Sequence, residues 1–181
     1  MPKKFASAKD RYFIDFPKRI RDIQAEMAKS WIDVYLGTRL RTLSWTIGAF
    51  CPWRSYVVIP ARGLPTAFTF VIDAARVADD SWLGQEHVMG YGPMGDQDQI
   101  TLLSNCIVSY LKGGKGVVGI ESGMATYLPE GNITQYEYEC LKGALPKARF
   151  QNAHEIIDRL SVKPNVVGLI VVGLEPDCSL G

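Results

Sequence analysis

The chain has 181 residues, 47% of them hydrophobic and 22% charged, and its formal net charge is +1. This length and composition are typical of a globular protein and exclude an intrinsically disordered chain. They also exclude a transmembrane helix, because the longest apolar run, 166–174, is shorter than the roughly twenty residues that span a bilayer.

The N-terminus and the cysteines indicate the compartment. The first residues are basic but lack the apolar segment of a secretory signal. Cys51, Cys106, Cys140 and Cys178 are far apart, form no C-x-x-C pair and have no nearby histidine. We therefore expect a protein of the cytoplasm or another reducing compartment, not secreted, with no metal and no cofactor.

The first half of the chain predicts one helix followed by strands. Residues 17–36 carry apolar side chains at helical spacing, and Gly37 suits the helix end. Apolar and polar residues then alternate over 42–49, which is typical of a half-buried strand. Two further β-rich segments follow at 55–59 and 66–72. Because the connections between these segments are short, we expect an antiparallel meander.

The second half predicts a mixture of helices and strands. In chain order we expect a short helix at 74–80 within an ordered, glycine-rich loop that extends from 73 to 99, a helix at 98–112, a strand at 116–121, an amphipathic strand at 132–141, a helix at 147–160 and a buried strand at 166–174.

Together these elements predict a single α+β domain over residues 17–181. We expect a mostly antiparallel sheet of about six strands, with a long N-terminal helix and two further helices packed on it. An arm of basic and aromatic residues, 1–16, precedes the domain.

The sequence Lys112-Gly113-Gly114-Lys115-Gly116 has the glycines and lysines of a phosphate-binding loop. Phosphate-binding loops lead from a strand into a helix, whereas this segment follows a predicted helix and precedes a predicted strand. We therefore interpret the segment as a helix stop.

Glu137 and Glu139 lie on one face of a predicted strand, and their E-x-E spacing is similar to that of ADP-ribosyltransferases. In that family two strand carboxylates hold a ribose and stabilise an oxocarbenium ion. Glu121 joins this pair if its strand is a neighbour, and His87 or Arg62 would then supply electrophilic support. A solvated strand face explains the same alternation, since so short a motif arises readily by chance.

A second group of residues is typical of an interface. Basic and aromatic side chains are interleaved near the N-terminus, and apolar side chains interrupt the glycine-rich loop. The candidate partner-binding residues are Lys3, Lys4, Phe5, Arg11, Tyr12, Phe13, Phe16, Lys18, Arg19, Trp82, Met89, Tyr91 and Met94. Nucleic acid also suits the basic arm. We favour a protein partner over nucleic acid, because the positive and negative charges of the whole chain nearly cancel.

Charge is distributed unevenly along the chain. Residues 1–62 carry twelve Lys or Arg against five Asp or Glu, and residues 63–181 carry eight against fourteen. Such complementary charge suits contacts between subunits. We therefore interpret the chain as a non-enzymatic structural or interaction subunit of a homo- or hetero-oligomeric assembly, whose partners are copies of itself or other proteins. Two alternatives stay open, a small enzyme acting on a nucleotide or sugar-phosphate and a nucleic-acid-binding module. We expect no membrane insertion.

Overall fold

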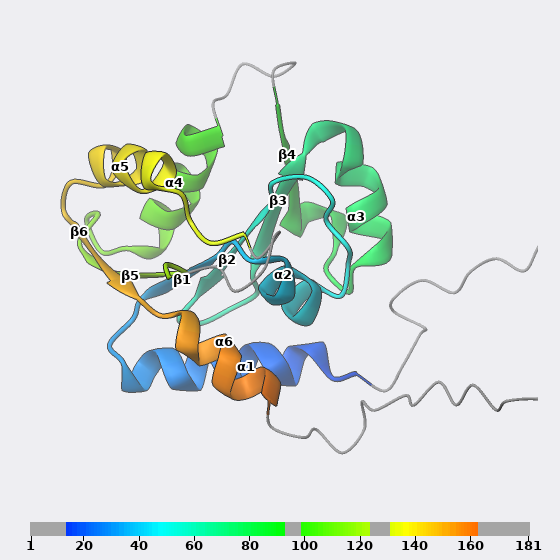
Figure 1. The fold of residues 1–181 in the computed structure, drawn as a ribbon, viewed down its shortest axis with the longest axis horizontal. Helices are drawn as coiled ribbons and strands as arrows, with labels where there is room; N and C mark the ends of the chain where they lie inside the picture. Colours follow the sequence, from blue (N-terminus) through cyan, green and yellow to red (C-terminus); the bar gives the residue numbers. More distant parts are fainter. Residues whose placement is uncertain (1–13, 93–98, 124–130, 163–181) are drawn as a thin grey trace, which may run out of the picture.

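The computed structural model describes residues 14–92, 99–123 and 131–162 (Figure 1). The strands are β1 (Val34–Gly37), β2 (Tyr56–Pro60), β3 (Thr66–Phe70), β4 (Val88–Tyr91), β5 (Gly116–Ile120) and β6 (Ala148–Asn152). The α-helices are α1 (Phe16–Lys29), α2 (Leu40–Ile47), α3 (Ala74–Asp80), α4 (Gln99–Tyr110), α5 (Gln135–Ala144) and α6 (His154–Val162).

The strands of the described residues form one sheet in the order β4-β3-β2-β1-β5-β6. β2 is antiparallel to both β1 and β3, whereas the pairs β1–β5, β5–β6 and β3–β4 are parallel. The expectation of a mostly antiparallel sheet is therefore wrong, and the sheet is mixed. Parallel neighbours need long crossover connections. The helices between the strands supply them, which makes this a single-domain α/β fold.

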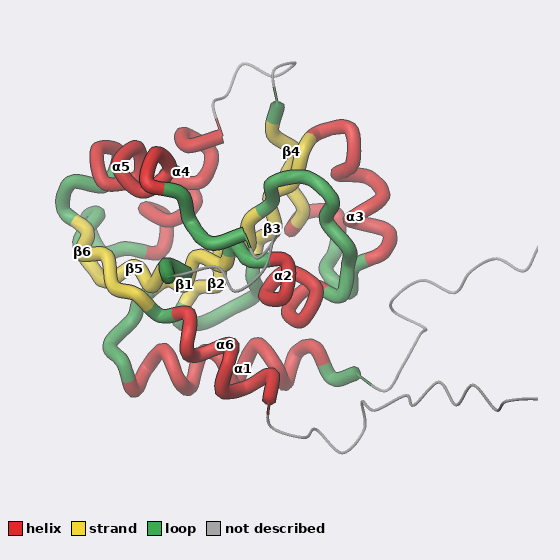
Figure 2. The backbone as a smooth tube through the Cα atoms, viewed as in Figure 1, coloured by secondary structure: helices red, strands yellow, loops and turns green. Residues whose placement is uncertain are grey.

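Helices cover both faces of the sheet (Figures 1 and 2). α1, α2 and α6 pack on one face, and α4 and α5 pack on the other. Within β2, Val57 and Ile59 belong to the first core, and Tyr56 and Val58 belong to the second. Successive side chains of a strand point to opposite faces, so a strand covered on both sides is apolar throughout. The doubly covered sheet is the rigid frame for the loops at its two ends.

The segment 42–49, predicted as a strand, is mostly helix α2. Thr42 and Leu43 are buried one turn before Thr46 and Ile47, and Thr46 Oγ1 donates to the Thr42 carbonyl oxygen at 2.6 Å. The strand prediction failed because inward-facing threonines disguised the helical period as an alternation of polar and apolar residues. Gly48 ends the helix in a left-handed conformation (φ 77°), a stop signal that the sequence did contain.

The segment 132–141, also predicted as a strand, contains most of helix α5. The Thr134 hydroxyl accepts from Glu137 N at 3.2 Å, and the Glu137 carboxylate accepts from Thr134 N at 2.7 Å. This capping box is encoded by the pattern T-x-x-E, which marks a helix start. The cap outweighs the alternation of aromatic and acidic residues. Helical spacing then buries Glu137 and leaves Glu139 exposed.

Two predicted helices each contain a strand. The predicted helix at 17–36 ends at Lys29, and β1 begins at Val34. The predicted helix at 147–160 is divided into β6 and α6. β1 is buried at every position, so no alternation of polar and apolar residues marks it in the sequence.

The other elements agree better with prediction. α3 has the predicted bounds, α4 lies within the predicted helix, and β2, β3 and β5 coincide with predicted strands. The predicted loop at 73–99 also contains β4. The predicted strand at 166–174 and most of the N-terminal arm lie outside the described residues. No helix in the described ranges is long and apolar enough to cross a membrane.

Candidate functional site

A fully buried carboxylate, Glu121, follows β5 directly. It accepts hydrogen bonds from the backbone N–H groups of Thr38 at 2.6 Å and Arg39 at 2.8 Å. Tyr35 Oη at 2.8 Å, Arg39 Nε at 2.9 Å and Thr42 Oγ1 also donate to it. Buried polar groups need such partners because no water reaches them. One carboxylate therefore holds the whole turn between β1 and α2.

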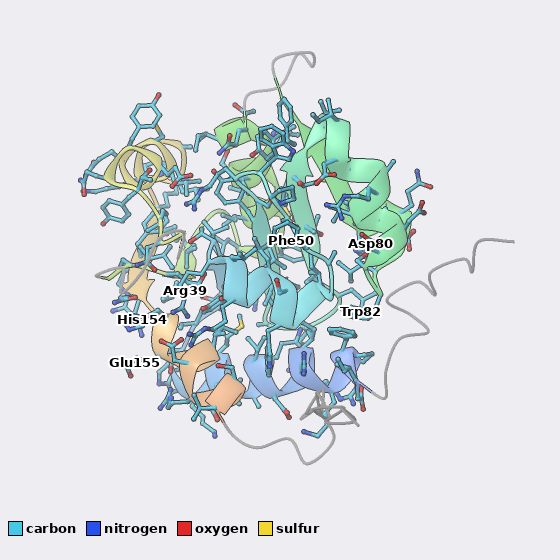
Figure 3. The ribbon with its side chains drawn as sticks, turned by 45° about the vertical axis from the view of Figure 1, so that its right-hand side comes forward. Arg39, Phe50, Asp80, Trp82, His154 and Glu155 are labelled. Atoms are coloured by element: carbon cyan, nitrogen blue, oxygen red, sulfur yellow. The ribbon has the colours of Figure 1, made fainter. Side chains whose placement is uncertain are left out.

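Arg39 connects this turn to α6 (Figure 3). Its side chain is only 3% exposed; Nη1 donates to Asp158 Oδ1 and Nη2 to the His154 carbonyl oxygen, both at 3.0 Å. Burial alone lowers the pKa of Arg39, but the Glu121 carboxylate raises it above its ordinary value. Burial, reinforced by Glu121, raises the pKa of Tyr35 far above its ordinary value. Arg39 therefore stays charged beside a neutral tyrosine.

A second buried carboxylate, Glu137 of α5, holds the segment before β2. Arg54 Nε and Nη2 donate to its two oxygens at 2.7 Å each, and Tyr56 Oη donates at 2.5 Å. Arg54 Nη1 also donates to the Gly131 carbonyl oxygen at 2.7 Å. Burial acts to raise the pKa of Glu137, but the hydrogen bonds from Arg54, Tyr56 and Thr134 N lower it below its ordinary value.

A cleft of about 250 Å³ lies between these two held segments. Phe50 and Trp53, from the loop between α2 and β2, are 59% and 50% exposed. The lining residues are Thr38, Leu40, Leu43, Phe50, Cys51, Pro52, Trp53, Arg54, Ser55 and Gly131. Neither Glu121 nor Glu137 lines the cleft. The two carboxylates act on it indirectly, by fixing Thr38 on one wall and Arg54 on the other.

Thr38, one of the lining residues, carries a hydroxyl that is not used in hydrogen bonding within the described ranges. Its side chain is buried, and Oγ1 has no hydrogen-bond partner among the residues that the structure describes. An unsatisfied buried hydroxyl costs about 1–3 kcal/mol of stability. Because Oγ1 is itself shielded from solvent, a ligand in the cleft that offers a hydrogen-bond acceptor would remove this cost only after the Thr38 side chain turns towards it.

Gly131 lies where the two walls approach each other. Its φ is 81°, and an added Cβ would lie 3.0 Å from the Thr38 carbonyl oxygen and 3.4 Å from Arg39 Cα. Only glycine adopts this conformation without strain while leaving room for both neighbours. The glycine therefore permits the close approach that defines the cleft.

Cys51 lines the cleft as an apolar group. Burial raises the pKa of its thiol to about 11. The thiolate is the nucleophilic form of cysteine, so a thiol with this pKa is unreactive at neutral pH.

The predicted catalytic residues are not brought together. Glu121 and Glu137 belong to separate hydrogen-bond networks, and Glu139 is exposed on the other side of α5. Arg62 follows β2 at the end of the sheet opposite Glu121, and His87 precedes β4. The E-x-E interpretation is therefore wrong, because it required a strand where the chain forms a helix. Within the described ranges, no group of three or more His, Cys, Asp or Glu side chains is placed to hold a metal ion.

Sequence reasoning missed the cleft. The segment Cys51-Pro52-Trp53-Arg54, which follows Phe50, was interpreted only as a connection between strands. Its density of aromatic residues around a proline was the available signal, because loops seldom expose two large aromatic side chains without a binding role.

The predicted partner-binding residues have different surroundings. Lys3, Lys4, Phe5, Arg11, Tyr12, Phe13 and Met94 lie outside the described residues. Phe16 is buried and stacks on Trp82, with Arg19 above its ring. Exposed Lys18 pairs with Asp22 on α1, Met89 is exposed on β4, and the Tyr91 hydroxyl donates to the Arg54 carbonyl oxygen. Their part in partner binding stays a prediction.

Comparison with known proteins identifies the fold. No protein family and no curated protein matches the sequence. Among solved structures, a proline dipeptidase from Streptococcus pneumoniae TIGR4 matches with a TM-score of 0.63 at 16% identity, over 80% of this chain and 98% of that chain. The N-terminal domain of the cytoplasmic peptidase PepQ from Mycobacterium tuberculosis H37Rv matches with a TM-score of 0.60 at 16% identity, over 79% of this chain and 98% of that domain. The prolidase from Thermococcus sibiricus matches with a TM-score of 0.64 at 15% identity, over 81% of this chain but 37% of that chain.

At these identities the likeness establishes a shared fold, that of a peptidase N-terminal domain. The interpretation as a non-enzymatic structural subunit of an assembly is therefore wrong, since the matched proteins are peptidases. The matches give no support to a nucleotide-directed enzyme or a nucleic-acid-binding module either.

Proposed function

We propose that this chain is a peptidase-related domain that binds proline-containing peptides in the cleft beside Thr38 and Trp53. The observation that carries the proposal is the likeness to a proline dipeptidase, which extends over 80% of this chain and nearly all of the matched one. In the Thermococcus sibiricus prolidase the match covers 37% of the chain. Peptide binding by this domain would therefore assist hydrolysis that is carried out by a separate domain of a prolidase-like enzyme.

The lining of the cleft supports a proline ligand. Proline is rigid and apolar, and proline-rich peptides bind in grooves walled by aromatic side chains. Phe50 and Trp53 offer such walls, and Pro52 and Leu43 extend the apolar lining. A volume of about 250 Å³ is slightly below the range of drug-sized pockets and suits one or two residues of a peptide.

The polar side of the cleft also suits an Xaa-Pro bond. This bond presents a carbonyl acceptor but no N–H donor, because the proline nitrogen carries no hydrogen. Thr38 Oγ1 offers a donor without a partner in the described residues, and Arg54 offers positive charge although its guanidinium is held by Glu137. With the Thr38 hydroxyl turned towards the ligand, the cleft would satisfy a carbonyl oxygen without requiring a donor from the ligand.

Trp53→Ala is expected to weaken the binding of an Ala-Pro dipeptide by about tenfold, because the apolar area that the indole and the proline ring would bury against each other contributes roughly 25 cal/mol per Å². Isothermal titration calorimetry of the full chain measures the effect, with Ala-Ala as the comparison peptide. Trp31→Ala is the matched control, since Trp31 is also exposed but precedes β1 at the opposite end of the sheet. Equal affinity for Ala-Pro and Ala-Ala would contradict the proposal, as would equal losses in the two variants.

Thr38→Val separates binding from stability. Valine keeps the branched shape and removes a buried hydroxyl that has no partner, so the free energy of unfolding is expected to stay constant or to rise by about 1 kcal/mol. Affinity for Ala-Pro is expected to fall about fivefold, the effect of one neutral hydrogen bond. Urea unfolding and the same calorimetric titration measure the two quantities. A stabilised variant that retains full affinity would show that the hydroxyl does not contact the peptide.

A further inference from the structure

A row of basic residues lies at the end of the sheet opposite the cleft. The cleft is built by segments that follow β1 and precede β2, whereas this row lies before β1, β5 and β6 and after β2. Its cations are Arg62 after β2, Lys112 and Lys115 before β5, and Lys147 before β6. We call these four residues the basic rim. Trp31, before β1, lies within the same row.

Backbone hydrogen bonds and strand register fix the order of the row. Ala61 N donates to the Asp33 carbonyl oxygen, and Asp33 N donates to the Val117 carbonyl oxygen, both at 2.9 Å. The segments that carry Arg62, Trp31 and Lys115 are therefore side by side. β5 pairs with β6 in a register that places Lys115 next to Lys147. Since neighbouring strands are about 4.8 Å apart, the row from β2 to β6 spans roughly 14 Å.

The cations of the basic rim outnumber the acidic groups of the row, in which the Asp33 carboxylate accepts a hydrogen bond from Val117 N at 2.8 Å. All four side chains are exposed, and none forms an ion pair within the part of the chain that the structure describes. Several basic side chains elsewhere on the surface do have acidic partners, for example Lys18 with Asp22 and Arg76 with Asp80, each at 2.7 Å, whereas exposed Lys142 and Arg149 form no ion pair among the described residues. Cations this close repel one another, because their spacing is at or below the Debye length of about 10 Å in 0.1 M salt. An anionic partner would relieve the repulsion.

Trp31 is the second unusual feature of this row. Its side chain is 82% exposed, and its φ of 56° is the only positive value recorded for a residue other than glycine in the described ranges. A left-handed conformation costs a residue with a side chain about 1–2 kcal/mol, and glycine is the usual choice just after a helix. Packing within the domain does not explain a tryptophan here. Exposed tryptophan is typical of the contact residues that dominate protein interfaces.

We infer that the basic rim and Trp31 form a docking surface for an extended acidic segment of a partner polypeptide. Side chains on one side of an extended segment recur about every 7 Å, so two or three carboxylates fit along a row of roughly 14 Å, within reach of the long Lys and Arg side chains. An apolar residue within the segment would cover Trp31. The surface is at the other end of the sheet from the peptide cleft, so this inference goes beyond the proposed function and does not depend on it.

The test uses a fluorescein-labelled peptide of Asp and Glu residues around one Phe, titrated with the full chain by fluorescence anisotropy. Binding is expected, and it should weaken as salt rises from about 0.1 to 1 M, because the Debye length falls from about 10 to 3 Å. Lys112→Gln/Lys115→Gln is expected to weaken binding at least about tenfold through the loss of two of the complementary charges. The same peptide with Asn and Gln in place of Asp and Glu should not bind.

Two further variants make the test specific. Lys18→Gln/Arg21→Gln removes the same charge from the N-terminal half of α1 and should change affinity less than about twofold, as exposed charges far from an interface do. Trp31→Gly should weaken binding about fivefold or more, as loss of an interface tryptophan does, while urea unfolding shows equal or greater stability, because glycine adopts φ above zero without strain. Equal losses in the two double variants would overturn the inference, as would full binding by Trp31→Gly. Displacement of the peptide by a lower concentration of a single-stranded oligonucleotide would also overturn it.

Discussion

Glu121→Ala is expected to lower the free energy of unfolding by about 3–5 kcal/mol, the usual effect of removing one partner from a buried ion pair. Arg39, whose side chain is 3% exposed, would lose the buried Glu121 carboxylate and keep its ion pair with Asp158, a carboxylate that is 36% exposed. The N–H groups of Thr38 and Arg39 and the Tyr35 hydroxyl would also lose their acceptor. Urea unfolding, followed by circular dichroism, measures the change.

Glu155→Ala is the matched control for this experiment. Glu155 is an exposed glutamate on α6, near the far end of the Arg39 network (Figure 3), and its removal should change stability by less than about 0.5 kcal/mol. Glu121→Leu/Arg39→Met, which removes both charges, should recover part of the loss, because an apolar pair leaves no buried charge uncompensated. A loss below about 1 kcal/mol for Glu121→Ala would mean that the Arg39 guanidinium finds another partner or reaches water.

The same variant connects the fold to the cleft. Glu121 is the acceptor for the turn that carries Thr38, so its loss should weaken Ala-Pro binding even under conditions where the domain stays folded. In the sequence, Glu121 was a catalytic candidate only as a third carboxylate beside Glu137 and Glu139. The sequence did not reveal the five donors that occupy its carboxylate.

Local signals account for the parts of the fold that were predictable. α3, α4 and the hairpin of β2 and β3 carry a clear period and turn residues, and all were assigned correctly. β1 has four buried positions and no alternation, so nothing in its own residues separates it from the preceding helix. Its identity as a strand comes from its neighbours β2 and β5, a long-range effect that local pattern cannot supply.

The incorrect strand predictions at α2 and α5 have a different origin, because each segment contained a recognisable helix signal in its sequence. Gly48 marks the end of α2, and the Thr134–Glu137 capping box marks the start of α5. In both, an alternation of polar and apolar residues was weighed above the cap. Caps deserve the greater weight in short helices, where the few turns give the period little statistical power.

The cleft was the least predictable feature, since its walls come from residues far apart in the sequence. Thr38 follows β1, Trp53 precedes β2, and Gly131 precedes α5. The pairing of β1 with β2 and with β5, and the hydrogen bond from Arg54 to the Gly131 carbonyl oxygen, bring them together. Predicting this cleft requires the strand order, which depends on contacts between segments far apart in the chain.

Glu137→Gln is expected to destabilise the domain by about 1.5–3 kcal/mol at pH 7, the contribution of hydrogen bonds to a charged group. In the folded chain Arg54, Tyr56 and the backbone of Thr134 favour the ionised carboxylate of Glu137 and lower its pKa, although burial acts in the opposite direction. The unfolded chain keeps the ordinary glutamate pKa of about 4.3 and so binds a proton more readily. The stabilisation is therefore complete above that value and is lost as pH falls through the lower pKa of the folded state.

The difference in stability between wild type and Glu137→Gln should consequently shrink as the pH is lowered from 7 towards about 3, which is measured by urea unfolding at a series of pH values. Glu139→Gln is the control, because Glu139 lies two residues further along α5 and is exposed, and it should have little effect at any pH. A difference that stays constant over this pH range would show that the carboxylate contributes through shape rather than charge.

Because Glu137 holds Arg54 against one wall of the cleft, affinity for Ala-Pro should fall in Glu137→Gln and remain unchanged in Glu139→Gln. Both readouts thus test whether the pair Arg54–Glu137 couples the α5 layer to peptide binding.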